Sequence, residues 1–223
     1  MKENSNDNEM TNKSNHKDTD STVSMEGVAN PQIEKIEWEK LGMFDYIFQD
    51  VLFHNRNISR LTCIKRYLFS FTFNVTVKFR LVQYLKLHRK NRYIIKLLEF
   101  SYSRRNVKHG IYLPAETCVG AGVIFPHAYP LVIHPATVIG ENCIIHPNVQ
   151  IGTSRTKAGA PIIGDNCFLG NGCHIIGNCK IGDWCFISPG AFVCKDIPEG
   201  SVVGYGLNNI ISSKGKETIL FYL

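Results

Sequence analysis

The sequence lacks the features that would place it outside the cell or across a membrane. Asn, Ser, Asp, Lys and Thr dominate the first 30 residues, and no apolar run follows the opening charges, so no secretory leader is visible. The longest apolar run, 67–77, is interrupted by polar residues and is shorter than the about 20 residues that a bilayer requires. Without an export signal, the eight cysteines are expected to be reduced thiols. These absences predict a cytoplasmic protein.

Acidic side chains are scarce in one part of the chain. Between Arg56 and Lys108 there are fourteen Lys or Arg residues and a single acid, Glu99. An anionic membrane surface, a phosphorylated substrate or nucleic acid would satisfy this charge, and a solvated helix face would carry it equally well. No recognisable nucleic-acid-binding motif accompanies the basic residues, so nucleic acid is not expected as a partner.

Composition divides the chain into parts of different character. The first part is polar and poor in aromatics, which predicts a disordered tail. The second carries apolar residues at three- and four-residue spacings, which is typical of several helices, with boundaries near Asn57–Ile58 and Arg89–Arg92. After His109 the residues Gly, Ile, Val, Cys and Pro replace the long basic side chains. The predicted parts are a disordered tail at 1–30, a helical domain at 31–109, a repeat domain at 110–210 and a C-terminal tail at 211–223.

The second half of the chain repeats every six residues. Ile, Leu or Val occupies all ten positions of one register: Ile133, Ile139, Ile145, Ile151, Ile163, Leu169, Ile175, Ile181, Ile187 and Val193. A glycine follows the aliphatic residue in five units: Gly140, Gly152, Gly164, Gly170 and Gly182. Each unit predicts one short strand and one corner, and three units would form a triangular coil with the aliphatic column inside. The register therefore predicts a parallel β-helix.

Five cysteines share one position of this repeat, four residues after an aliphatic position: Cys143, Cys167, Cys173, Cys179 and Cys185. Zinc sites prefer two to four residues between paired cysteines, and this register lacks that spacing. Free cysteine behaves as a small buried hydrophobe. The pattern predicts core packing rather than metal binding or catalysis.

Two irregularities interrupt the repeat. Upstream the period continues as Leu113, Val119, Phe125 and Leu131, and the phase then moves by two residues to Ile133, so something is inserted at that corner. The segment 154–160 occupies one repeat without its aliphatic residue, which predicts a loop that leaves the wall of the β-helix.

The repeat and these irregularities, after a helical N-terminal part, resemble the serine acetyltransferase branch of the hexapeptide-repeat acyltransferases, including relatives that O-acetylate polysaccharides. The resemblance covers about residues 30 to 210, and 125–133 matches the family's Asp-His run, with His127 on the catalytic histidine. The end of the repeat also matches, apart from Gly206 where Pro is usual. The resemblance implies an α+β chain in which helices precede a left-handed parallel β-helix. It also implies acetyl-CoA as the acetyl donor and no metal.

The departures from the family pattern concern the acceptor. Pro126 and Tyr112 stand where the family has acids, and Gly159 and Ala160 stand where it has an Arg-His pair that helps to hold serine. We therefore expect an enzyme that acetylates a sugar hydroxyl of a polysaccharide, capsule or glycan precursor. The alternatives are serine O-acetyltransferase and a non-catalytic β-helix scaffold.

The resemblance assigns roles to individual residues. His127 is expected to be the general base, because neutral imidazole suits proton abstraction near neutral pH. The predicted acceptor-binding residues are Tyr112, Tyr129 and His146, and the predicted cofactor-binding residues are Gly152, Thr153, Gly170, Asn171, Pro189 and Lys195. The tautomer of His127 would be fixed by a backbone carbonyl or by the hydroxyl of Tyr112. His134 and His174 are interpreted as structural or substrate-facing.

The resemblance also implies an assembly. In the family the donor lies between the β-helices of neighbouring subunits, so a homotrimer is expected, and the helical part could join two trimers. The basic segment from Arg56 to Lys108 could instead contact an anionic membrane peripherally.

Overall fold

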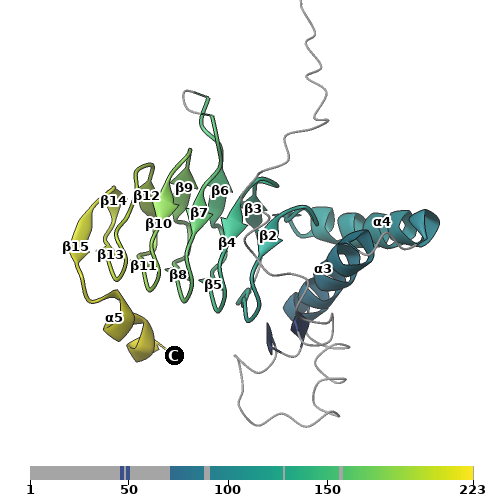
Figure 1. The fold of residues 1–223 in the computed structure, drawn as a ribbon, viewed down its shortest axis with the longest axis horizontal. Coiled ribbons are helices and arrows are strands. Elements are labelled where there is room, and N and C mark those ends of the chain that lie inside the picture. Colours follow the sequence, from purple (N-terminus) through teal and green to yellow (C-terminus); the bar gives the residue numbers. More distant parts are fainter. Residues whose placement is uncertain are drawn as a thin grey trace, which may run out of the picture.

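The computed structural model describes residues 46–47, 49–50, 71–87, 91–127, 129–155 and 158–222. The predicted tail, 1–30, and the predicted boundary at Asn57–Ile58 lie outside these residues. In the described part, two long helices stand at one end of a stack of short strands, and a shorter helix lies near the other end (Figure 1). None of the described helices is long and apolar enough to cross a membrane.

The two long helices are α3 (Phe71–Leu87) and α4 (Arg92–Lys108), and they pack against each other. The side chain of Asn91 caps α4 by accepting a hydrogen bond from the N–H of Tyr93 at 2.9 Å. Helix α4 thus begins at Arg92, the last residue of the predicted boundary Arg89–Arg92. The Tyr102 hydroxyl of α4 donates to the carbonyl of Leu113 at 2.7 Å, which holds this helix against the first coil of strands.

The strands that follow form the three faces of a prism, here named faces A, B and C. Face A contains, in spatial order, β1 (Ile111–Tyr112), β3 (Leu131–Ile133), β6 (Gln150–Gly152), β9 (His174–Ile176), β12 (Ala191–Val193) and β14 (Gly206–Leu207). Face B contains β10 (Lys180–Ile181), β7 (Ile162–Ile163), β4 (Val138–Ile139) and β2 (Cys118–Val119). Face C contains β15 (Ile210–Ser212), β13 (Val202–Val203), β11 (Phe186–Ile187), β8 (Phe168–Leu169) and β5 (Ile144–Ile145).

As far as β14 the chain visits the faces in the order A, B, C, and each strand pairs in parallel with its equivalent in the next coil. The last strand, β15, returns directly to face C and pairs antiparallel with β13. The predicted left-handed parallel β-helix, preceded by helices, is confirmed.

The predicted aliphatic column fills the interior of the prism. All ten residues of the register are at most 2% exposed. The upstream residues Leu113, Val119, Phe125 and Leu131 are also buried. Leu131 and Ile133 both lie on β3, so the phase shift is taken up at the corner between Phe125 and this strand.

The repeat cysteines lie in the same core. All five are buried, and the thiols of Cys143 and Cys167 approach the carbonyls of Gly164 and Gly182 in the following coil at 3.2 Å each. The predicted packing role is confirmed. Among the described residues, no cluster of His, Cys, Asp and Glu is arranged to hold a metal ion.

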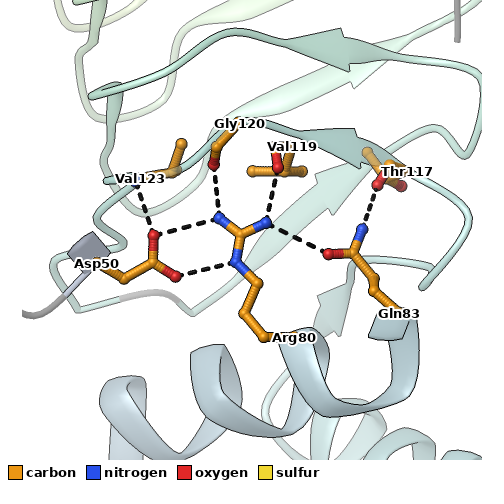
Figure 2. Close-up of polar contacts among 7 residues, drawn as sticks. All are labelled: Asp50, Arg80, Gln83, Thr117, Val119, Gly120 and Val123. Atoms are coloured by element: carbon orange, nitrogen blue, oxygen red, sulfur yellow. Dashed lines mark hydrogen bonds and ion pairs between the residues drawn. The ribbon is translucent and has the colours of Figure 1, made fainter. Parts of the chain in front are cut away.

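A buried ion pair joins the helices to the first coil (Figure 2). Nε of Arg80, on α3, donates to Oδ2 of Asp50 at 2.9 Å, and both side chains are 3% exposed. The guanidinium also donates to the carbonyls of Val119 and Gly120 at 2.6 and 2.5 Å. Asp50 in turn accepts from the N–H of Val123 at 3.1 Å. The helical part is therefore fixed to the turn that leads toward His127.

The predicted C-terminal tail contains regular structure. After β15, helix α5 (Gly215–Tyr222) returns along face C and contacts β11. Ile219 is buried there beside Phe168 and Phe186. The outward side of face C is thus partly covered by the end of the chain.

Candidate functional site

The three edges of the prism separate the predicted site residues. The edge between faces C and A, here the CA edge, is formed by residues 125–127, 129–130, 146–149, 170–173, 188–190 and 204–205. The edge between faces A and B, here the AB edge, is formed by residues 113–117, 134–137, 153–155, 158–161, 177–179 and 194–196. His127, Tyr129 and His146 all fall on the CA edge.

His127 occupies a left-handed backbone position that recurs along this edge. Its φ is +52°, in the left-handed region, and its side chain is exposed. The next three coils place Asn148, Gly172 and Gly190 at positive φ on the same edge, and glycine and asparagine adopt this conformation with least strain. A strained non-glycine residue is typical of functional sites. The extra residues of the phase shift enlarge this corner around His127.

Backbone hydrogen bonds hold the corner of His146 directly beside that of His127. The N–H of Ile145 donates to the carbonyl of Ile124 at 2.9 Å, and the N–H of Asn148 donates to the carbonyl of Pro130 at 2.6 Å. His146 lies in the chain between the two residues that donate these bonds, Ile145 and Asn148. His127 lies between the two residues that accept them, Ile124 and Pro130. Two imidazoles therefore project from adjacent coils of one edge.

The environment of His146 favours the uncharged form of its ring. Burial lowers the pKa of His146, and the charge of nearby His127 lowers it further. The ring packs on Phe168, with centroids 4.8 Å apart. Phe168 stacks on Phe186 at 4.6 Å, and Tyr222 of α5 lies 5.8 Å from Phe168. An aromatic ladder thus runs from the C-terminal helix to the candidate site.

Sequence reasoning did not predict this ladder. Phe168 and Phe186 each directly precede an aliphatic residue of the core register, where an outward side chain is expected, and they are 8% and 6% exposed. Large aromatics at outward positions of a repeat are the signal that something covers that face.

The two predicted tyrosines take different positions. Tyr112 points outward on face A, where it is 55% exposed and pairs in register with Val132. Tyr129 lies on the CA edge two residues after His127, and its ring is 5.7 Å from that of His109. Within the described residues, no hydrogen bond joins the hydroxyl of Tyr112 to His127. The assignment of Tyr112 as the group that fixes the tautomer stays a prediction.

The predicted cofactor-binding residues do not meet within one chain. Gly170, Asn171 and Pro189 lie on the CA edge with His127. Gly152 ends β6, Thr153 follows it on the AB edge, and Lys195 lies on that edge two coils further on. Face A separates these two edges, so the two sets form separate groups on one chain.

The loop between β6 and β7 explains one departure from the family pattern. Gly159 has a φ of +115°, and a Cβ at this position would lie 2.7 Å from Cγ of Asn178. An arginine there would have to displace Asn178. Ala160 is buried, so this pair of positions closes the loop against the next coil instead of presenting charged side chains.

The other histidines have structural contacts. Nδ1 of His134 accepts a hydrogen bond from the N–H of Ala136 at 3.2 Å, and burial lowers the pKa of His134. The ring of His174 stacks on Phe192 with centroids 6.0 Å apart.

Comparisons with known proteins agree with this geometry. Residues 160–195 match the family model described as bacterial transferase hexapeptide (six repeats). This part of the β-helix is similar to the hexapeptide repeat of bacterial transferases. Serine acetyltransferase of Buchnera aphidicola subsp. Schizaphis graminum is 29% identical over 61% of this chain and 56% of its own length. Serine acetyltransferase 5 of Arabidopsis thaliana is 36% identical over 45% of this chain and 33% of its own length. The match thus spans less than two thirds of the length of these relatives.

Solved structures share the fold. A serine acetyltransferase of Neisseria gonorrhoeae in complex with serine has a TM-score of 0.63 and 23% identity, over 76% of this chain and 69% of the other. A serine acetyltransferase of Brucella abortus strain S19 in complex with coenzyme A has a TM-score of 0.62 and 23% identity, over 81% of this chain and 70% of the other.

The expected polysaccharide, capsule or glycan acceptor is wrong. The relatives and the structural neighbours above are serine acetyltransferases, which was the alternative. The expectation rested on the absence of acidic and Arg-His groups at four positions. A missing contact for serine does not create a surface that recognises a sugar, and the loop at Gly159 shows that local packing accounts for part of this departure.

Proposed function

We propose that this chain is a serine O-acetyltransferase that uses acetyl-CoA as donor and His127 as general base. The observation that carries the proposal is the placement of His127, exposed and in a left-handed turn at the enlarged corner of a hexapeptide-transferase β-helix. The corresponding stretch of the sequence resembles the catalytic run of serine acetyltransferases.

The reaction would proceed by direct transfer. A neutral nitrogen of His127 takes the proton of the serine hydroxyl while the oxygen attacks the thioester carbonyl carbon. The C–S bond then breaks, and the departing sulfur takes the proton back from the imidazolium, giving O-acetylserine and a free thiol. Backbone N–H groups near Gly152 and Thr153 would stabilise the negative oxygen that develops on the carbonyl.

The acceptor would lie at the corner of the first coil. Tyr129 and His146 flank His127 on the CA edge, and Tyr112 lies on the adjoining face A. These three residues offer hydroxyl and imidazole groups that would contact serine in place of the acids found in the family.

The donor would lie between two copies of the chain. If the CA edge of one copy faces the AB edge of the next, Gly170, Asn171 and Pro189 of one subunit meet Gly152, Thr153 and Lys195 of its neighbour. Lys195 is exposed and carries the positive charge that suits a phosphate. Repeating this heterologous contact around a three-fold axis closes a homotrimer, and the long helices could join two trimers.

We further propose a cytoplasmic location. The basic helical segment offers a peripheral contact with anionic membrane, since α4 exposes Tyr93, Leu97 and Phe100 beside Arg92 and Arg104.

The test compares wild type with His127→Asn. Asparagine tolerates the left-handed turn, as Asn148 does one coil later, so the fold should be retained. Formation of O-acetylserine from serine and acetyl-CoA, measured by mass spectrometry, should fall about 10²- to 10⁴-fold. His174→Asn is the matched control and should keep full activity. A wild type that transfers no acetyl to serine would refute the proposed substrate, and equal rates in wild type and His127→Asn would refute the proposed base.

A further inference from the structure

A general base needs a partner that fixes its tautomer and ring orientation. In the family that the sequence resembles, an acid precedes the catalytic histidine, but here Pro126 offers neither a donor nor an acceptor on its side chain. Among the residues that the structure describes, none forms a hydrogen bond with the imidazole of His127. The orientation of this ring therefore has to come from another group at the same corner.

His146 is placed to be that group. The bonds from Ile145 to Ile124 and from Asn148 to Pro130 pin the two corner segments together at both ends. Adjacent strands lie about 4.8 Å apart, so side chains of adjacent coils on one edge are within reach of each other. The direct electrostatic effect of His127 on His146 agrees with this proximity.

The surroundings of His146 suit the role of a neutral acceptor. Phe168 packs on the ring, and Phe186 and Tyr222 extend the apolar surroundings from β11 and α5. The electrostatic effect of nearby His127 also disfavours the charged form of His146. A neutral imidazole has one nitrogen that accepts a hydrogen bond and one that donates.

We propose that His146 is a positioning residue for His127. Its unprotonated nitrogen accepts a hydrogen bond from the N–H of His127, directly or through one water molecule, and leaves the other nitrogen of His127 free to take the hydroxyl proton. When His127 becomes an imidazolium, the same bond stabilises its charge. This assignment rests on the proposed function and replaces the carboxylate of the family by a neutral imidazole from the next coil.

The kinetic test uses two substitutions at one position. His146→Phe keeps the aromatic contact with Phe168 but removes the acceptor, and kcat should fall about 10²-fold with an unchanged KM for acetyl-CoA. His146→Gln keeps an acceptor and should recover part of this loss. If His146→Phe retains the wild-type kcat, or if both variants lose activity equally while remaining folded, the positioning role is overturned.

A second measurement does not depend on activity. Histidine side-chain NMR titration of the full chain should show His146 titrating below the usual histidine range, and His127→Asn should raise its pKa because a neighbouring positive charge is removed. An unchanged His146 titration in His127→Asn would overturn the pairing. If wild type leaves serine unmodified but the titrations are coupled, the proposed substrate fails while the pairing stands.

Discussion

Arg80 and Asp50 form a buried ion pair that also fixes the first coil of the β-helix. The guanidinium reaches Asp50 on one side and the carbonyls of Val119 and Gly120 on the other (Figure 2). Burial raises the pKa of Asp50, and Arg80 opposes this rise. These contacts lie a few residues before His127. The helical part therefore supports the corner that carries the proposed base.

Arg80→Met tests this support. The substitution leaves the Asp50 carboxyl and two carbonyls buried without their partner, so we expect the free energy of unfolding to fall by about 3–5 kcal/mol. Lys86→Met is the control, because Lys86 pairs with Glu99 and Glu116 at partly exposed positions and should contribute about 1 kcal/mol or less. Chemical denaturation of both variants gives the comparison. Equal stabilities of the two variants would mean that the Arg80 contacts do not hold the helical part to the first coil.

The sequence predicted the β-helix because every sixth residue has to fill a narrow interior, and Ile139 or Leu169 can do so only from an inward position. It also indicated the corner at which His127 lies, because an insertion changes the phase of that column there; the catalytic role of His127 stays a prediction. It did not predict the position of α5, since the contacts of Ile219 and Tyr222 join segments far apart in the chain. Nor did the sequence analysis assign the predicted cofactor-binding residues to the CA and AB edges, because it used only the period of the register and not the position of each residue around the coil.

The two histidines with lowered pKa predict how stability depends on pH. Burial lowers the pKa of both His134 and His146 in the folded chain. The unfolded chain then binds more protons below about pH 6.5, so their contribution to stability is present above that pH and is lost as the pH falls. Thermal melts should show a decline between neutral and mildly acidic pH. In His146→Phe the decline should be smaller, and an identical decline would assign the effect to other groups.

The repeat cysteines should resist alkylation. Burial raises the pKa of Cys173 to about 12, whereas Cys194 is exposed on the AB edge. Because the thiolate is the reactive form, iodoacetamide at pH 8 should label Cys194 well before Cys143, Cys167 or Cys173. Peptide mapping by mass spectrometry distinguishes the sites, and labelling in denaturant provides the control. Rapid native labelling of the buried thiols would contradict the core position of the cysteine column.

The glycines of the repeat look alike in the sequence but should differ in their tolerance of a side chain. A Cβ at Gly164 would lie 2.8 Å from the backbone nitrogen of Asp183 and 2.9 Å from the carbonyl carbon of Gly182, whereas a Cβ at Gly152 would meet its nearest neighbour, Ile176, at 3.7 Å. Gly164→Ala must therefore push two coils apart and weaken the bond from its N–H to Ile181, now 2.8 Å long. We expect a loss of about 1–3 kcal/mol for Gly164→Ala and little change for Gly152→Ala, measured by chemical denaturation. Equal losses would mean that the glycines are required for the bend of the corner and not for the close approach of the coils.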